Sequence, residues 1–237
     1  MDLPKLRAYL DDLIQSLSSE DRSLLGARLR GLISVFPFNE YEYILTFLVD
    51  RQIIRFQEYE KLRNEYISAN PYLGLFELAP RIFGDLWCRQ HLMDLDSRFQ
   101  HPKKSLDPDY QPGQYDLWCE GHRIEIKAAR AIDTKKRGAL VSKALRRSSP
   151  RPFWMNFQQI KPDMSDVFIF IGVWVDEIAY WVMSAEEVRT NKYLSHQHRG
   201  GIEYQIGITP DNIYEFDLYK VPRQDLVRTV QMKGKKT

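Results

Sequence analysis

The sequence predicts a mixed protein of the α/β or α+β class, in which a helical N-terminal part precedes a β-sheet core. Apolar residues recur three and four positions apart from Leu3 to about Leu95, which is the spacing of helices. Residues 100–113 are rich in Pro, Asp and Lys and are typical of a loop. Short runs of β-branched and aromatic residues follow. The expected division is a helical region of residues 1–95 and a core of residues 96–237.

The composition is that of a folded chain. Hydrophobic residues make up 43% of it and charged residues 28%, which is typical of a globular protein rather than a disordered one. The formal net charge is only +2, because 34 cationic side chains face 32 anionic ones, so charge alone does not indicate a nucleic-acid partner. Cys88 and Cys119 lie outside any CxxC or Cys/His ligand spacing, and we expect both thiols to be reduced and buried.

Targeting and membrane signals are not expected. The N-terminal residues MDLPKLRAYLDDLIQSL alternate charged with apolar residues and lack the continuous apolar core of a signal peptide. No stretch approaches the ~20 apolar residues that span a bilayer. A cytoplasmic protein without a membrane partner is the expectation.

Four helices and one further amphipathic segment are expected in the first region. The first helix carries an apolar stripe that runs from Leu6 to Leu17, and the sequence Ser18-Ser19-Glu20-Asp21 predicts an N-cap for the second. Pro80 marks either a first-turn position or a kink within the amphipathic segment. The bounds expected for the second, third and fourth helices and for this segment are 22–36, 39–54, 56–68 and 73–93.

The second region should form a mixed sheet. Residues 115–119 and 122–128 are predicted as two strands joined by a tight turn at Glu120-Gly121. Further strands are expected over residues 167–175, 178–183 and 203–208, helices over 135–147 and 185–193, and a basic tail at the C-terminal end.

The expected hairpin determines which side chains face one another. If Cys119 pairs with His122, Asp116 lies directly opposite Glu125, with Cβ atoms about 4.5 to 5.5 Å apart. Side chains alternate along a strand, so Lys127 projects on the same face as Glu125 and the apolar residues between them point to the other face.

Two opposed carboxylates destabilise a sheet unless a cation neutralises them. Mg²⁺ is usually held by one or two carboxylates together with waters and a substrate phosphate, which matches Asp116 and Glu125. Lys127 would position or help to deprotonate a water and stabilise charge on the phosphorus. Any alternating strand with Glu and Lys two residues apart gives the same three-residue pattern. The prediction of a catalytic site therefore depends on the hairpin, which places Asp116 opposite Glu125.

The stretch GQYDLWCEGHRIEIKAAR, residues 113–130, resembles the core motif of the PD-(D/E)xK nuclease superfamily, which includes type II restriction endonucleases. Tyr115 stands where the name-giving Pro would be. The downstream IKP and SQHRGG segments are similar in general look to several restriction enzymes, and the resemblance covers residues 113–208. It implies a restriction-endonuclease-like mixed sheet flanked by helices, with Asp116 and Glu125 as metal ligands.

In that family an acid from a helix before the hairpin often joins the metal site. Glu77 and Asp85 are the candidates here, and Glu77 is preferred as a further catalytic residue. The alternative is that Glu77 is a solvated helix position.

Contacts to DNA are expected from two groups of residues after the hairpin. The first is a set of cations with no acid among them, whose expected partners are phosphates, although a solvated helix face would look the same: Lys135, Lys136, Arg137, Lys143, Arg146, Arg147 and Arg151. The second is a polar loop that can reach base edges, although it would also suit a simple turn: His196, Gln197, His198 and Arg199. Two histidines without a third ligand nearby do not favour zinc. Gln158 and Gln159 are expected either to line the active centre or to be structural, and Gln159 is included among the DNA contacts.

The function expected from these observations is that of a type II site-specific deoxyribonuclease that hydrolyses double-stranded DNA with Mg²⁺. A homodimer is expected, because a two-fold symmetric protein matches a palindromic site, and no nucleotide cofactor is expected. A repair or recombination nuclease with the same core is one alternative. A DNA-binding module in which the carboxylate pair is structural is another.

Overall fold

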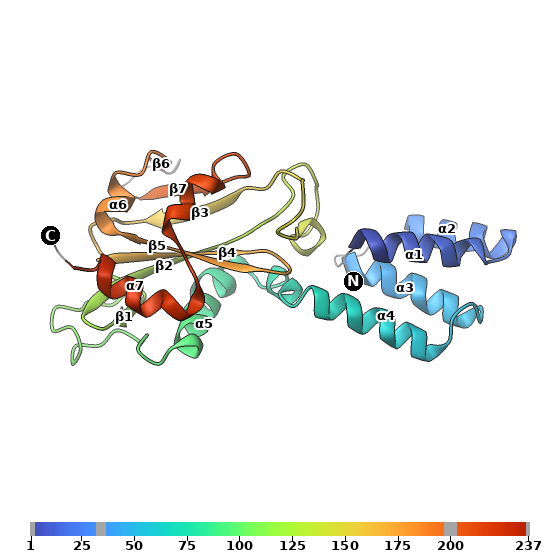
Figure 1. Cartoon of the computed structure of the whole chain (residues 1–237), viewed down its shortest axis with the longest axis horizontal. Helices are drawn as coiled ribbons and strands as arrows, with labels where there is room; N and C mark the ends of the chain where they lie inside the picture. Colours follow the sequence, from blue (N-terminus) through green and yellow to red (C-terminus); the bar gives the residue numbers. More distant parts are fainter. Residues whose placement is uncertain (1–2, 32–36, 197–202, 236–237) are drawn as a thin grey trace.

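The computed structural model describes residues 3–31, 37–196 and 203–235, and it shows a mixed α and β protein (Figure 1). A group of four helices lies to one side of a larger unit built around two sheets. This arrangement confirms the mixed class expected from the sequence. Among the described residues no helix is long and apolar enough to cross a membrane.

The four N-terminal helices enclose a hydrophobic core of their own. They are α1 (Leu3–Gln15), α2 (Ser19–Gly31), α3 (Pro37–Asp50) and α4 (Phe56–Ala69). Leu6, Leu10 and Leu45 are fully buried in this core. Ser18 Oγ accepts a hydrogen bond from Asp21 N at 3.0 Å, as the predicted N-cap requires. The predicted C-terminal end of the second helix lies outside the described residues.

The helical segment that follows belongs to the sheet unit rather than to the helical group. It consists of the 3₁₀ turn η1 (Leu73–Phe76), the π-helix η2 (Ile82–Trp87) and α5 (Cys88–Leu95). Phe76 and Leu92 are buried in the same cluster as the strands of the large sheet. Pro80 opens the helical turn before η2, which confirms the first-turn alternative. Hydrophobic contacts therefore divide the chain near residue 70 rather than at residue 95.

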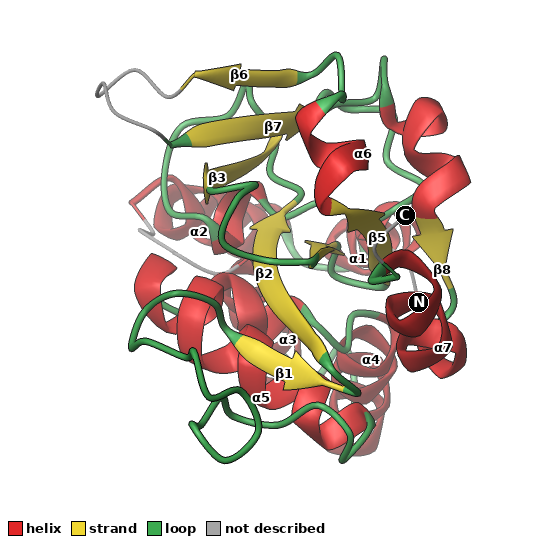
Figure 2. Ribbon diagram, turned by 90° about the vertical axis from the view of Figure 1, so that its left-hand side faces the viewer, coloured by secondary structure: helices red, strands yellow, loops and turns green. Residues whose placement is uncertain are grey.

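The larger sheet has the strand order β1-β2-β4-β5-β8. Only β2 and β4 run parallel, and the other neighbours are antiparallel. A smaller antiparallel sheet has the order β3-β7-β6 and lies beside it (Figure 2). The bounds are β1 (Leu117–Cys119), β2 (His122–Arg130), β3 (Met155–Ile160), β4 (Val167–Val173), β5 (Ile178–Ser184), β6 (Leu194–His196), β7 (Tyr204–Ile208) and β8 (Lys220–Val221).

Both faces of the large sheet are covered. Its first face packs on α5 and on α7 (Leu226–Lys233), with Ile124 and Ile126 of β2 among the buried residues. The opposite face packs against the small sheet through aromatic residues such as Phe168 and Phe170 of β4. In the register of β2 with β4, Glu125 is aligned with Phe168 and Lys127 with Phe170. Because aligned residues share a face, Glu125 and Lys127 project toward the small sheet.

The structure differs from the prediction at several elements. The predicted helix over residues 135–147 is wrong: the segment is a loop with one 3₁₀ turn, η3 (Val141–Lys143). Gly138 has a φ of +115°, which a right-handed helix does not allow. Isolated β-bridges pair Ile132 with Ala144 and Asp133 with Phe153, so the chain is extended at both ends of this loop. The predicted helix over 185–193 is shortened to α6 (Ala185–Arg189). Strands β3, β6 and β8, together with α7 and the 3₁₀ turns η4 (Ile213–Tyr219) and η5 (Arg223–Asp225), were not predicted.

Both cysteines are free and buried, as predicted. Burial raises the pKa of the Cys88 thiol to about 12 and that of Cys119 to about 12. Each side chain therefore acts as a small apolar core residue.

Gly172 of β4 lies where the two sheets meet, and we predict that Gly172→Ala destabilises the protein. A Cβ there would stand 2.6 Å from the Trp181 ring and 2.9 Å from Met155 Sδ, so the interface would have to open. The expected loss is about 1 to 3 kcal/mol in the free energy of unfolding, measured by urea denaturation. Gly74→Ala is the control, because nothing lies within 4 Å of its Cβ position. Equal stability of the two variants would contradict the tight contact between the sheets.

Candidate active site

The β1–β2 hairpin has the predicted register. Cys119 pairs with His122 and Leu117 pairs with Ile124. The two turn residues, Glu120 and Gly121, have φ values of +49° and +92°. Two positive φ angles are the mark of a type I′ turn, whose twist matches that of the strands. The turn therefore fixes which residue of β1 stands beside which residue of β2.

Asp116 stands at the start of this hairpin and completes its ladder with a side chain. Its backbone N donates to Ile124 O at 3.0 Å, and its Oδ2 accepts from Ile126 N at 2.8 Å. Asp116 is thus held next to Glu125, the residue between these two. Its other carboxylate oxygen, Oδ1, accepts no hydrogen bond from the part of the chain that is described, and it remains open to a ligand.

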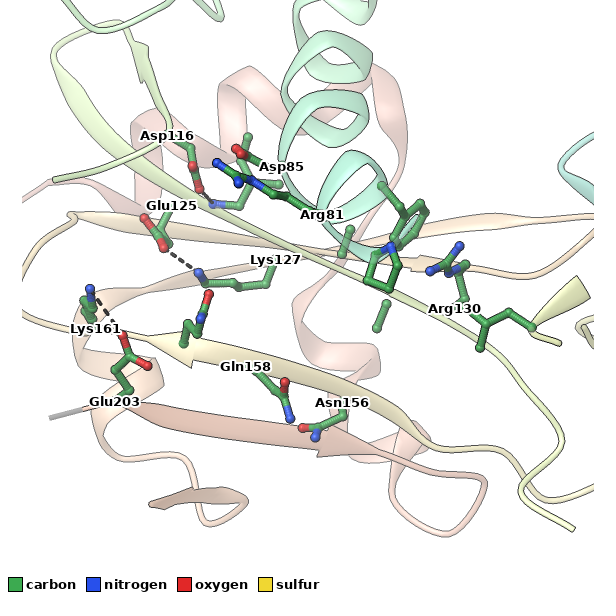
Figure 3. A pocket seen from close by; sticks show the side chains of 18 of the residues that line it. Arg81, Asp85, Asp116, Glu125, Lys127, Arg130, Asn156, Gln158, Lys161 and Glu203 are labelled. Atoms are coloured by element: carbon green, nitrogen blue, oxygen red, sulfur yellow. Dashed lines mark hydrogen bonds and ion pairs between the residues drawn. The ribbon is translucent and has the colours of Figure 1, made fainter. Parts of the chain in front are cut away.

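Glu125 and Lys127 form an ion pair on the face of β2 that looks toward the small sheet (Figure 3). Lys127 Nζ lies 2.6 Å from Glu125 Oε1, and the two side chains are only 15% and 13% exposed. Burial raises the pKa of Glu125 to about 7, while the neighbouring Lys127 opposes this shift and the Asp116 carboxylate adds to it. The structure therefore brings together all three residues that the sequence singled out.

These side chains line a cleft of about 890 Å³. Strand β2 forms its floor, β3 of the small sheet forms one wall, and the start of the helical segment with Arg81 and Asp85 forms another (Figure 3). Ile126 also lines the cleft, but its side chain is buried in the core, so its main chain is the part that faces the cavity. An open cavity with converging polar groups is where catalysis or binding is expected.

A second ion pair stands near the first. Lys161 Nζ lies 3.4 Å from Glu203 Oε1, and both residues line the cleft (Figure 3). Lys161 is close enough to Glu125 to lower the pKa of that carboxyl against the larger effect of burial. Lys161 belongs to the IKP segment, but the sequence predicted no role for it. Strand β3, which directly precedes Lys161 and would have placed it beside β2, was not predicted.

Asp85, and not Glu77, is the helical acid that lines this cleft. Glu77 follows η1 and borders a separate hollow of about 270 Å³ beside Leu140. The preference for Glu77 is therefore corrected: it precedes the helix that Pro80 opens, whereas Asp85 lies more than a turn inside it. Asp85 forms an ion pair with Arg89 on the next turn.

Arg130 fixes the segment that carries Asp85 against the end of β2. Its guanidinium donates to Leu75 O and Leu78 O, both at 2.8 Å, and lies 4.3 Å from the centre of the Phe83 ring. Burial lowers the pKa of Arg130 to about 10. The wall of the cleft is thus anchored to the strand that carries Glu125.

Asp116 and Glu125 are the residues of the cleft that could hold a cation. Mg²⁺ keeps several waters and is usually bound through one or two carboxylates. Within the described ranges no group of three or more His, Cys, Asp and Glu residues could hold a metal ion. The raised pKa of Glu125 reflects a buried negative charge that a dication would compensate.

The predicted phosphate-binding cations lie in a loop and not along a helix. Three of them have partners within the chain: Arg146 lies 3.3 Å from Asp176, Arg151 lies 3.1 Å from Asp133, and the Arg147 guanidinium stacks over Trp174 at 4.7 Å. The others have no acidic partner in the described structure, and the first three of them are exposed: Lys135, Lys136, Arg137 and Lys143.

Only some of the residues expected to reach base edges lie within the described ranges. His196 ends β6, with its ring 4.6 Å from that of Tyr204. Gln197, His198 and Arg199 lie outside the described residues. Gln158 and Gln159 are exposed and line the cleft.

Comparison with protein-family models, with curated proteins and with solved structures finds no match to this chain. The functional assignment therefore depends on the chemistry of the cleft, above all on Asp116, Glu125 and Lys127.

The raised pKa of Glu125 predicts how the metal-free protein responds to pH. Glu125 ionises near 4.5 when its surroundings do not perturb it and near 7 in the fold, so between these values the folded state binds the extra proton. The contribution of Glu125 to stability must then fall as pH rises from 5 to 8. Glu125→Gln removes this loss, which is on the order of 2 kcal/mol. Urea unfolding at both pH values in EDTA measures the difference, and an equal pH response of the two proteins would contradict it.

Proposed function

We propose that this chain is a magnesium-dependent endonuclease that hydrolyses phosphodiester bonds of double-stranded DNA at specific sites, with a core like that of restriction endonucleases. One observation carries the proposal: Asp116 and the buried Glu125–Lys127 ion pair converge in one open cleft. The pKa of Glu125, raised to about 7 by burial, supports this proposal because perturbed carboxylates in a cleft cluster at functional sites.

Asp116 and Glu125 would hold the cation through the open Oδ1 of Asp116 and the carboxylate of Glu125. Bound Mg²⁺ supplies a polarised phosphoryl oxygen and a more acidic water. With Glu125 engaged by a cation, Lys127 Nζ, now 2.6 Å from Glu125 Oε1, would be available to donate to a phosphate oxygen. Lys127 then stabilises the charge that develops on the phosphorus and positions the attacking water.

Exposed cations supply the contacts to the duplex. The loop that follows β2, which ends at Arg130, carries three of these cations: Lys135, Lys136 and Arg137. Phosphate contacts of this kind set the register on DNA without reading its sequence. A homodimer in the cytoplasm, acting on a palindromic site, is the assembly we propose. A repair nuclease with the same core would cut according to DNA structure instead of sequence.

Asp116→Asn and Lys127→Ala should each lower DNA cleavage at least about 100-fold, because each removes a charge that acts on the reacting phosphate. The introduced asparagine would keep an oxygen for the Ile126 N–H, so folding should be unchanged. Plasmid cleavage with Mg²⁺ and urea unfolding measure the two effects. Glu77→Ala, outside the cleft, is the matched control and should retain full activity. Wild-type rates in either site variant would refute the assignment.

Replacing Mg²⁺ with Ca²⁺ should preserve specific DNA binding and stop hydrolysis. Calcium accepts the same carboxylate oxygens in a looser shell and does not activate the water in the same way. Gel-shift binding and cleavage measured on one duplex separate the two effects. Cleavage that proceeds in excess EDTA would rule out the metal mechanism.

A further inference from the structure

Strand β3 carries one extra residue at the edge of the cleft. Phe157 pairs with Ile206 and Ile160 with Tyr204, so three steps along β3 match two steps along β7. Gln159 takes up the difference with a φ of +57°. A bulge of this kind re-aims side chains and is frequent beside active sites.

The bulge places two consecutive amides on one side of the strand. Phe157 and Ile160 are both buried, whereas Gln158 and Gln159 between them are exposed and line the cleft. In a regular strand one of two neighbouring residues would point into the core. Neither glutamine side chain hydrogen-bonds to another residue in the described part of the chain. A left-handed conformation at a residue other than glycine costs about 1 to 2 kcal/mol, and the core does not require these amides.

Two further neutral side chains, Asn156 and Trp154, lie on this wall, which ends at the Lys161–Glu203 ion pair. Asn156 lies on β3 near Gln158 (Figure 3). Its Nδ2 donates to Gln205 Oε1 at 3.3 Å. Trp154 is 49% exposed and lies against Gly207, where a Cβ would come within 2.6 Å of the indole nitrogen. The cleft thus has Glu125 and Lys127 on β2, uncharged amide groups on β3 with the Trp154 indole just before it, and the Lys161–Glu203 ion pair beyond the end of β3.

Neutral amides bring no charge to a phosphate contact, and their paired donor and acceptor match the edge of a base. Glutamine binds adenine through two hydrogen bonds in the major groove. We infer that the bulged segment Gln158-Gln159 reads base edges next to the scissile phosphate, with adenine as the preferred base. This inference rests on the proposed nuclease function and adds the element that selects the sequence.

The test is cleavage of a randomised duplex library with Mg²⁺, followed by sequencing of the cut ends. Wild-type protein should give a consensus that contains adenine. Gln158→Ala and Gln159→Gly should each reduce the preference for adenine at one position by about 10- to 100-fold. The readout is the ratio of cleavage at sequences with and without this adenine, because a loss of chemistry lowers both rates alike and leaves the ratio unchanged. Gln57→Ala, an exposed glutamine on α4, is the matched control and should keep the wild-type consensus.

Two variants keep the test decisive if Gln158→Ala folds poorly. Gln159→Gly suits the positive φ and preserves the bulge. Gln158→Glu should move the preference toward cytosine, whose amino group a carboxylate accepts. An unchanged consensus in the folded variants would overturn the inference and leave the proposed nuclease function standing. Wild-type cleavage without any consensus would overturn the inference and the site specificity, and it would leave only magnesium-dependent hydrolysis standing. Wild-type protein that cuts no more than Asp116→Asn would overturn the nuclease function itself.

Discussion

Burial of Ile124 and Ile126 beneath α5 and α7 is the constraint on which the candidate site depends. Because side chains alternate along β2, these two isoleucines force Glu125 and Lys127 onto the opposite face, toward the small sheet. A slip of one residue in the hairpin would bury the charged pair and expose the isoleucines. The hydrophobic core therefore specifies the register, and the type I′ turn at Glu120-Gly121 specifies it a second time.

The same arrangement holds the Glu125 carboxylate in a buried position that disfavours its charged form. Glu125 is mostly buried, shares its surroundings with Asp116 and is compensated chiefly by Lys127 at 2.6 Å, with a smaller contribution from Lys161. A core built for stability would replace this pair with apolar side chains of similar size. Retaining it makes sense where a cation and a phosphate complete the charge balance, because the compensation that the fold lacks is then supplied by the ligands.

Local patterns predicted the hairpin, and long-range packing determined what was missed. The register around Asp116 follows from a two-residue turn and from alternation, both of which are visible in the sequence. Lys161 joins the site only because β3 packs across β2, and β3 itself was hidden by its bulge, which breaks the period of two. Glu77 and Asp85 have similar surroundings in the sequence, and only the start of the helix at Pro80 separates them in space. Gly138 interrupts the basic segment, where helix propensity was misleading.

Under the proposed function, the hydrolytic residues lie on the large sheet and the base-reading glutamines lie on the small sheet. One aromatic contact sets the distance between these two groups. Phe157 of β3 packs edge-on against Phe170 of β4, with ring centroids 5.2 Å apart. Phe170 is aligned with Lys127, and Phe157 directly precedes Gln158. The spacing between the lysine and the amides is therefore set by rigid core packing and not by loops. Amides on the small sheet can then change without disturbing the charged residues on β2, so under the proposed function base preference would vary while the hydrolytic centre stays the same.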